Sequence, residues 1–307
     1  MKERKIDKCN VTQNPKISPK TFNTARDYYF NRLKCIGRIS TGSKQLDNLL
    51  LCGGIETQAV TEFYGDYGLG TQICHTLSAI IPQDNSQGGL CGKSIYLDTE
   101  GNFRPERIFE IAKARGFDPD MTLDNIILEE ALYSSEQQEK IVENIAQHFL
   151  SENSNSSSTT NVNDRRIKLL VVDSPINHYR NEYIERKELP KRQKKLYRFM
   201  NSLKKIAYSY GIAVVVTNHV HTVPDRYFSS DTSDSKEPVG GNVMKQTTTY
   251  RVNLKRKYGV HNFQRIEYYR AEILSSTYHP RTYVDFGITD RGVVDFIHPL
   301  PPDEQHD

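Results

Sequence analysis

The sequence feature that most constrains the fold is a glycine-rich turn between an apolar run and a helix-like run. Ala59–Tyr64 has the composition of a buried strand, and Ile73–Leu77 begins the helix-like stretch. A strand that leads through glycines into a helix is the setting of a phosphate-binding loop, in which backbone N–H groups and the helix N-terminus hold an anion. The turn predicts an α/β fold with a nucleotide site, to which we assign Gly65, Asp66, Tyr67, Gly68, Leu69, Gly70, Thr71 and Gln72.

The turn departs from the usual motif, G-x-x-x-x-G-K-[ST], at one position. Gly65 and Gly70 have the expected spacing, but no lysine follows Gly70. One alignment treats the lysine as deleted and keeps Thr71 for Mg²⁺. The other places Thr71 at the lysine position and Gln72 at the threonine position. In both, a positive charge beside the phosphates is absent, and losing one such group costs on the order of 3 kcal/mol of transition-state stabilisation. We expect weakened ATP binding and more strongly impaired hydrolysis.

Strand-like and helix-like segments alternate along most of the chain. The expected strands are Ala59–Tyr64, Ser94–Asp98, Lys168–Asp173, Ile212–Asn218 and Thr249–Leu254. The expected helices are Pro105–Arg115, Ser135–Phe149 and Gln193–Tyr210. Apolar strands separated by helices favour a mostly parallel, twisted sheet that is covered by helices on both faces.

Changes in composition along the chain indicate where this α/β unit begins and ends. We expect a flexible tail at 1–21, a short N-terminal arm at 22–38, the core at 39–297 with a polar low-complexity loop at 151–164, and a second tail at 298–307. No apolar run approaches the roughly 18 residues of a membrane span, so we expect no membrane partner. The five cysteines are scattered without a Cys-x-x-Cys pair, which predicts reduced thiols rather than a zinc or disulfide framework. The net charge of +3 permits nucleic-acid binding without requiring it.

Polar residues end or directly follow three of the expected strands. Asp173 stands where a carboxylate can hold Mg²⁺, although an aspartate there can also cap a turn. Glu100 can orient and deprotonate a water for attack on the γ-phosphate, or it is an ordinary surface carboxylate. Asn218 and His219 can sense the γ-phosphate, or they form a satisfied polar strand end. The sequence of each strand end alone leaves these alternatives open.

Several further segments closely resemble the RecA-like strand-exchange recombinases, in particular the archaeal RadA and eukaryotic recombinase branch. The similar segments are collinear from about residue 22 to 297. They are Ile39–Asp47, Gly53–Thr57, Asp98–Arg107, Val172–Ser174, Asn177–Tyr183 and Pro238–Asn242. Several segments in the same order are far more specific than one loop motif. The resemblance implies a RecA-like P-loop ATPase core that uses ATP and Mg²⁺.

The resemblance also implies a role for each matching residue of the nucleotide site. Residues 65–71 would cradle the ATP phosphates. Glu100 would be the catalytic base that activates water, and Thr71 and Asp173 would bind Mg²⁺. Arg107 matches the arginine that stacks near the adenine, and Asn218 and His219 stand where the family couples the γ-phosphate to a DNA loop.

Filament assembly and DNA binding are implied in the same way. Phe22 and Ala25 match the F-x-x-A polymerisation motif, whose apolar side chains insert into the next protomer. The DNA-binding loops of the family correspond to about 183–192 and 221–241. A basic cluster around the first suits single- and double-stranded DNA, although a solvated helix face would look similar. We assign DNA binding to Arg180, Arg186, Lys187, Lys191, Arg192, Arg226, Gly240 and Gly241.

Three more departures from the family pattern bear on function. The family carries Gln at the position of His219, and its Asp-Ser-Pro segment is replaced here by Leu274–Ser276. Only some 20 residues precede Phe22, so we expect no helix-hairpin-helix domain before it. Two functions in recombination and DNA repair follow. One is a DNA-dependent ATPase that exchanges strands. The other is an ATPase-deficient paralogue that binds DNA and joins or caps recombinase filaments.

A third hypothesis, a regulator that keeps the nucleotide pocket only as structure, predicts no DNA binding and is disfavoured by the basic cluster. For the first two, the partner in the filament is the chain itself or a recombinase paralogue. The expected location follows the chromosome: the cytoplasm with the nucleoid in a prokaryote, and the nucleus in a eukaryote.

Overall fold

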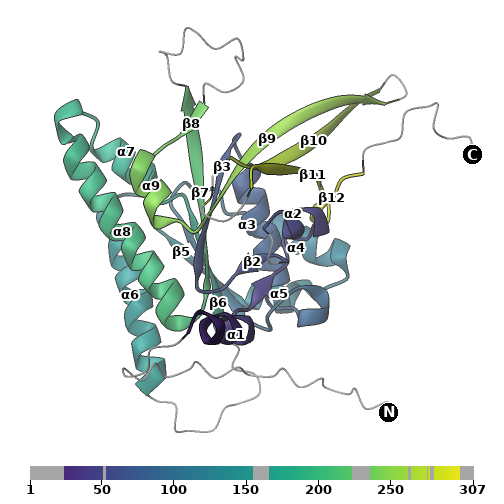
Figure 1. Ribbon diagram of the computed structural model, residues 1–307, viewed down its shortest axis with the longest axis horizontal. Helices are drawn as coiled ribbons and strands as arrows, with labels where there is room; N and C mark the ends of the chain where they lie inside the picture. Colours follow the sequence, from purple (N-terminus) through teal and green to yellow (C-terminus); the bar gives the residue numbers. More distant parts are fainter. Residues whose placement is uncertain are drawn as a thin grey trace, which may run out of the picture.

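The computed structural model describes residues 24–50, 53–154, 166–222, 236–261, 264–274, 276 and 280–297. In this part of the chain a ten-stranded sheet runs through the centre (Figure 1). Its order is β12-β11-β10-β9-β3-β7-β6-β4-β5, and β8 pairs with β7 off this path. The sheet is mostly parallel and is flanked by helices, which confirms the fold class that the sequence predicts.

Six neighbouring strands form the parallel part of the sheet. They are β3 (Ala59–Gly65), β4 (Lys93–Asp98), β5 (Ile126–Glu130), β6 (Ile167–Asp173), β7 (Ala213–Thr222) and β9 (Tyr250–His261). All pairings among them are parallel, so their carboxyl ends meet at one edge of the sheet. Five of them overlap the strands predicted from sequence, although β7 and β9 begin one residue later and extend well beyond the predicted ends. Ligands of open α/β sheets bind at this edge.

An antiparallel part continues the sheet beyond β9, and sequence reasoning did not anticipate it. It consists of β10 (Gln264–Ile273), β11 (Thr282–Thr289) and β12 (Gly292–Asp295). β8 (Lys236–Pro238) runs antiparallel to the end of β7. A separate antiparallel pair is formed by β1 (Arg38–Ile39) and β2 (Ile55–Glu56). Only one face of β10 and β11 meets the core, so polar residues alternate with the core-facing ones and these strands show no continuous apolar run.

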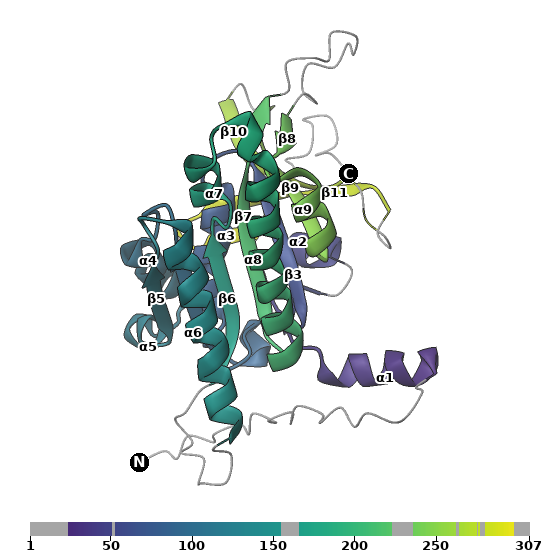
Figure 2. The same ribbon diagram turned by 90° about the vertical axis from the view of Figure 1, so that its left-hand side faces the viewer.

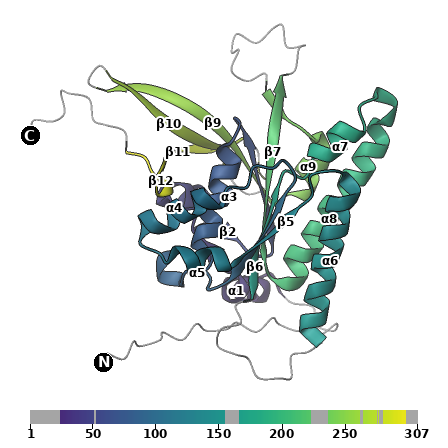
Figure 3. The same cartoon turned by 180° about the vertical axis from the view of Figure 1, so that it is seen from behind.

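Helices cover both faces of the parallel part. One face carries α3 (Leu69–Ile80), η1 (Asn85–Gln87), α4 (Pro105–Arg115) and α5 (Pro119–Asp124), while α2 (Lys44–Leu49) packs against β11 and β12 of the antiparallel part. The other face carries α6 (Ser135–Ser154), α7 (Asn177–Glu182), η2 (Arg186–Glu188), α8 (Leu189–Tyr210) and α9 (Gly241–Thr247). Figure 2 shows α6 and α8 in front of the sheet, and Figure 3 shows α3, α4 and α5 from behind. Two hydrophobic cores therefore flank one sheet.

The alternation of side chains along the strands explains why both cores form. In β6, Leu169 and Val171 belong to the core under α3, whereas Leu170 and Val172 belong to the core under α8. Consecutive strand residues point to opposite faces, so a continuous apolar run buries itself on both sides. The rigid parallel strands then fix the positions of the residues that follow them.

Helix α1 (Ala25–Cys35) lies apart from this body, and none of its residues is buried (Figure 2). Thr24 and Asp27 form a capping box at its start. Arg32 joins it to the body through a 2.7 Å ion pair with the buried Glu56. The predicted arm is therefore helical from Ala25 onward, while Phe22 and Arg226 lie outside the described residues.

Three further expectations from sequence can be compared with the described structure. Helix α6 continues to Ser154, so the first four residues of the polar loop predicted at 151–164 are helical. Cys91 is disulfide-bonded, which makes the expectation of reduced thiols wrong at this position. Within the described residues, no helix combines the length and apolar character needed to cross a lipid bilayer.

Candidate nucleotide site

The predicted phosphate loop is a short turn between β3 and α3. Strand β3 ends at Gly65 and helix α3 begins at Leu69, so three residues make the connection. A Cβ on Gly65, whose φ is +144°, would lie 2.0 Å from the carbonyl oxygen of Leu254, so only glycine fits there. Gly68 precedes the helix with a φ of +80°. The N-terminus of α3 thus opens at the carboxyl edge of the sheet, where backbone N–H groups can hold an anion.

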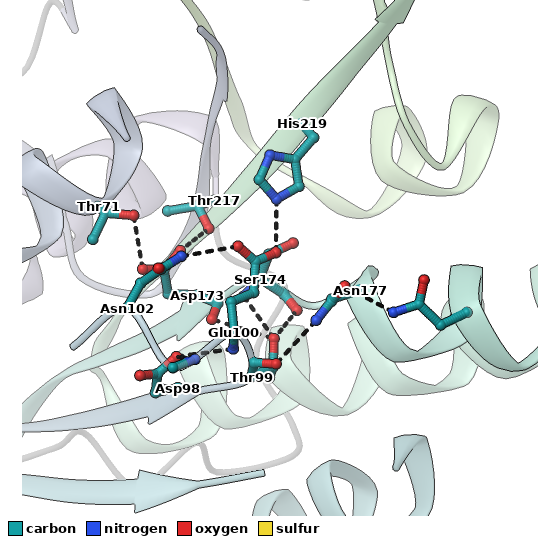
Figure 4. Close-up of polar contacts among 12 residues, drawn as sticks. Thr71, Asp98, Thr99, Glu100, Asn102, Asp173, Ser174, Asn177, Thr217 and His219 are labelled. Carbon is teal, nitrogen blue, oxygen red and sulfur yellow. Dashed lines mark hydrogen bonds and ion pairs between the residues drawn. The ribbon is translucent and has the colours of Figure 1, made fainter. Parts of the chain in front are cut away.

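Thr71 lies against the carboxylate that ends strand β6. Its hydroxyl donates to Asp173 Oδ2 over 2.9 Å (Figure 4). Gln72 instead points to the other side of the loop, where its Oε1 accepts from Arg107 Nε at 3.0 Å. The fold therefore gives Thr71, and not Gln72, the place beside the strand-end carboxylate. This placement matches the alignment in which the lysine is deleted.

Both carboxylate oxygens of Asp173 accept hydrogen bonds from side-chain hydroxyl groups of the protein. Besides Thr71, Tyr96 donates to Oδ2 over 2.8 Å and Thr217 donates to Oδ1 over 2.5 Å. Burial raises the pKa of this carboxyl above its ordinary value, and the three hydroxyl donors oppose that rise. The Asp173 carboxylate and the Thr71 hydroxyl beside it are hard oxygen donors, which is the kind of ligand that Mg²⁺ prefers. Among the described residues no group of three or more His, Cys, Asp or Glu could form a closed metal cage.

Glu100 is held in a loop that Asp98 shapes. The Asp98 carboxylate accepts backbone N–H bonds from Glu100, Gly101 and Phe103 at 2.8–2.9 Å, which fixes the turn after β4. Glu100 is mostly buried, and its Oε1 lies 2.6 Å from His219 Nε2 (Figure 4). Asn102 donates to its other oxygen at 3.1 Å. The hydrogen bond with Glu100 raises the pKa of His219, against the effect of burial.

Four residues of this cluster are not among the site residues assigned from sequence, namely Tyr96, Asp98, Asn102 and Thr217. Tyr96 and Asp98 stand at alternate positions of one strand end, and the same alternation separates Thr217 from His219. Side chains two apart in a strand point to the same face. That period, applied to β4 and β7, is the signal that could have found Tyr96, Asp98 and Thr217, whereas Asn102 lies in the loop after β4.

A cavity of about 440 Å³ lies on the Gln72 side of the loop. Tyr67, Arg107, Tyr269 and Ile288 are among the residues that line it. Arg107 is fixed by Gln72 and by the carbonyl oxygens of Thr289 and Asp290. A guanidinium plane beside aromatic and apolar side chains suits a flat heterocycle such as a nucleobase.

A second cavity, of about 210 Å³, lies between the loop and the end of β7. It is lined by Gly65, Tyr67, His219 and Lys236, with Asp66 and Val220. The His219 ring stacks on Tyr67 with 6.4 Å between ring centroids. Because His219 also bonds to Glu100, this cavity lies on the same side of the loop as the candidate base.

Asn218 is turned away from this cluster. Its amide nitrogen donates to Glu62 Oε1 and to the carbonyl oxygen of Val239, both at 2.7 Å. The structure therefore brings His219, but not Asn218, to the predicted nucleotide site. Gly240 is buried ahead of α9, where a Cβ would lie 2.6 Å from Met244, and Gly241 is exposed.

Helix α7 and the start of α8, which carry most of the predicted DNA-binding residues in the described part of the chain, lie toward the end of the molecule at which β3 and β7 finish (Figure 1). Arg180 is on α7, Arg186 and Lys187 are in η2, and Lys191 and Arg192 are in the first turn of α8. The segment expected as a loop at 183–192 is thus largely helical. All of these side chains are exposed except the half-buried Arg192. The ammonium groups of Lys191 and Lys195 lie over the ring of Tyr183, 5.2 and 5.7 Å from its centroid.

Two comparisons with known proteins identify the family of this chain. The sequence profile of the Rad51 family matches residues 31–296. The DNA repair and recombination protein RadA of Cenarchaeum symbiosum (strain A) is 40% identical over 277 residues, which are 90% of this chain and 63% of that protein. The chain therefore spans somewhat less than two thirds of this relative's length.

Proposed function

Since the chain belongs to the RecA-like recombinase family of RadA and Rad51 proteins, we propose that it binds ATP at residues 65–72 and acts on DNA in homologous recombination and repair. The observation that carries the nucleotide part is the convergence of Thr71, Asp173 and Glu100 at the edge where α3 begins. A hydroxyl, a buried carboxylate and a candidate base meet there although they come from distant parts of the chain. Such a set suits phosphoryl transfer to water.

In this proposal each side chain has one task. Thr71 and Asp173 hold Mg²⁺, which supplies positive charge to the phosphate oxygens. Glu100 accepts a proton from the attacking water, and His219 holds Glu100 in place through the 2.6 Å hydrogen bond. Arg107 and the cavity beside it receive the base. The backbone N–H groups before α3 bind the phosphates.

The exposed cations of α7, η2 and α8 are proposed to bind the phosphate backbone of single- and double-stranded DNA. They gather at the end of the molecule that also holds the nucleotide site. Binding of this kind weakens as salt rises, because counterions are released. The protein then acts where the chromosome is, in the cytoplasm of a prokaryote or the nucleus of a eukaryote.

Helix α1 is proposed to serve assembly with a second copy or with a recombinase paralogue. Tyr28, Tyr29, Phe30 and Leu33 are each about half exposed on a helix that buries none of its residues. Large apolar side chains grouped on an unpartnered helix are a typical interaction surface. Ala25, which matches the polymerisation motif, begins this helix.

The absent lysine favours a second candidate function, an ATPase-deficient paralogue that joins or caps recombinase filaments. ATP turnover with and without single-stranded DNA, measured beside a direct ATP titration, separates the two. DNA-stimulated turnover is the expected result for a working recombinase, and binding without turnover is expected for the paralogue. Absence of both would overturn the proposed nucleotide site.

The DNA part has its own test, in which Arg186→Ala is combined with Lys187→Ala. We expect weaker binding of single-stranded DNA and a slope of log K against log salt that is shallower by about 1.4, at about 0.7 for each phosphate that is no longer neutralised. The matched control is Lys204→Ala with Lys205→Ala, two exposed lysines near the far end of the same helix. Equally weakened binding in both double variants would remove η2 from the interface.

A further inference from the structure

Lys236 contacts the phosphate loop directly, although it comes from a different part of the chain. Its Nζ lies 3.0 Å from Asp66 Oδ1, in the turn between β3 and α3. Lys236 is the first residue of β8, which pairs with the end of β7 and so stands at the carboxyl edge of the sheet. Its side chain is 56% exposed and lines the 210 Å³ cavity together with His219.

Asp66 is held from two sides, so it does not depend on Lys236 for its position. Its Oδ2 accepts the backbone N–H of Arg256 at 2.9 Å. Burial acts to raise the pKa of Asp66, but this N–H bond and the Lys236 ammonium outweigh it and lower the pKa below its ordinary value. The carboxylate is therefore an anion that faces the loop, at a place where a nucleotide would bring further negative charge.

The other cations beside the loop are engaged elsewhere. Arg107 is fixed by Gln72 and two carbonyl oxygens on the far side of the loop. Arg256 pairs its guanidinium with Glu267 at 3.4 Å and lies near the ring of Tyr269. Among the described cations that line the two cavities, Lys236 combines a flexible stem, a loop carboxylate as partner and a position on the Glu100 side.

We propose that Lys236 supplies the positive charge that the loop lacks after Gly70, by leaving Asp66 for the γ-phosphate of a bound nucleoside triphosphate. The inference rests on the proposed nucleotide site and deepens it. A γ-phosphate carries more negative charge than one carboxylate, so the exchange is favoured once the triphosphate is present. Asp66 remains bonded to the Arg256 N–H, and the flexible lysine stem lets the ammonium move without moving β8.

In this proposal the Asp66 carboxylate competes with the γ-phosphate for the ammonium group of Lys236. Two substitutions should have opposite effects on affinity for the triphosphate. Lys236→Gln removes the charge, whereas Asp66→Asn removes the competitor and keeps an oxygen for the Arg256 N–H. A diphosphate, which ends before the cavity beside His219, should feel both changes less. Opposite signs for two partners of one ion pair distinguish ligand exchange from the breaking of a structural ion pair.

The experiment titrates the full chain with Mg²⁺ and either AMP-PNP, a non-hydrolysable triphosphate, or ADP. We expect Lys236→Gln to weaken AMP-PNP binding roughly tenfold, as the loss of a charge-assisted bond does, and to change ADP binding less than twofold. Asp66→Asn should tighten AMP-PNP binding about threefold. Lys245→Gln, an exposed lysine on α9, is the control and should change neither.

Each other outcome counts against the proposal. Equal weakening of both nucleotides by Lys236→Gln would reduce Lys236 to a general surface charge. A triphosphate-specific loss in Arg256→Gln, with none in Lys236→Gln, would give the role to the guanidinium. If the unaltered chain binds ADP but Lys236→Gln leaves AMP-PNP unaffected, only this inference falls. If the unaltered chain binds neither nucleotide, the proposed function falls with it. Thermal melting of each variant checks that all are folded.

Discussion

The candidate site has two sides that differ in how they are built. The carboxylate side consists of Asp173 and Glu100 with the side chains that bond to them. The phosphate side consists of residues 65–70 with Lys236. Asp173 is 2% exposed and Glu100 12%, and their side-chain oxygens are bonded within the protein, whereas Lys236 is 56% exposed. The side that would perform the chemistry is therefore buried and fixed by hydrogen bonds, whereas the side that would supply positive charge is exposed.

Because the two sides are built differently, the loop can be one residue shorter without loss of the site behind it. The carboxylates stand at the ends of parallel strands, whose register is set by two hydrophobic cores. The loop is a turn that connects two of these fixed elements. Shortening it by one residue leaves α3 able to bring Thr71 to Asp173. The fold thus preserves the geometry of the carboxylate side, while the charge of the phosphate side must come from elsewhere.

The strongest test of the comparison is Glu100→Gln. If the carboxylate side carries the chemistry, any ATP turnover of the chain should fall by about 10²–10⁴-fold, because the proton acceptor is lost. Binding of Mg²⁺ and ATP should change little, since Glu100 is not a ligand in the proposed site. A steady-state assay beside a binding titration measures both. Turnover that survives Glu100→Gln would show that the pre-assembled side is not the reactive one.

Restoring the lysine should have the next largest effect. Insertion of one Lys between Gly70 and Thr71 rebuilds the full motif, and we expect turnover to rise on the order of 10²–10³-fold. The substitution Gly70→Lys is the matched control, because it adds the charge without lengthening the loop and brings a Cβ to a tight 3.0 Å from Thr217 Cγ2. It should not raise turnover. An insertion variant that stays unchanged would mean that charge is not what the phosphate side lacks.

The third test uses pH to ask whether the core behind the carboxylate side depends on a neutral His75. His75 is buried beside Tyr96, with no hydrogen-bond partner for Nδ1, and burial, together with the charge of Arg107, lowers its pKa from 6.5 to about 4. As pH falls below 6.5, the unfolded chain takes up this proton before the folded one does. Stability is therefore full above pH 6.5, falls below it, and is lower by roughly 3 kcal/mol at pH 4.

His75→Leu should remove this part of the pH dependence. Urea unfolding of both chains between pH 7.5 and 4.5 gives the two slopes, and the difference between them isolates His75 from the carboxyl groups that titrate in the same range. Parallel slopes would mean that the core behind Tyr96 tolerates the imidazolium ion. The expected effect is on unfolding free energy alone, and nucleotide affinity at pH 7.5 should stay the same.

Much of this arrangement could be predicted before the fold was known. The apolar runs of β3, β4, β6 and β7 predict buried strands. Helix α4 begins and ends where Pro105 and Gly116 indicate. Asp173 and Glu100 were found because they follow such strands. The antiparallel part of the sheet was missed, since its alternating strands carry many charged and aromatic residues. The helical form of residues 186–192 was missed because the resemblance pointed to a loop.

Sequence alone determined most of the buried parallel strands, several helices and the position of the glycine-rich turn, because periodicity, capping and glycine spacing act over a few residues. Tertiary structure decided what stands beside what. It chose Thr71 over Gln72 for Asp173, turned Asn218 toward Glu62, paired His219 with Glu100 and brought Lys236 to Asp66. Each of these pairs joins residues more than 100 positions apart, and only strand order and register bring such distant residues together.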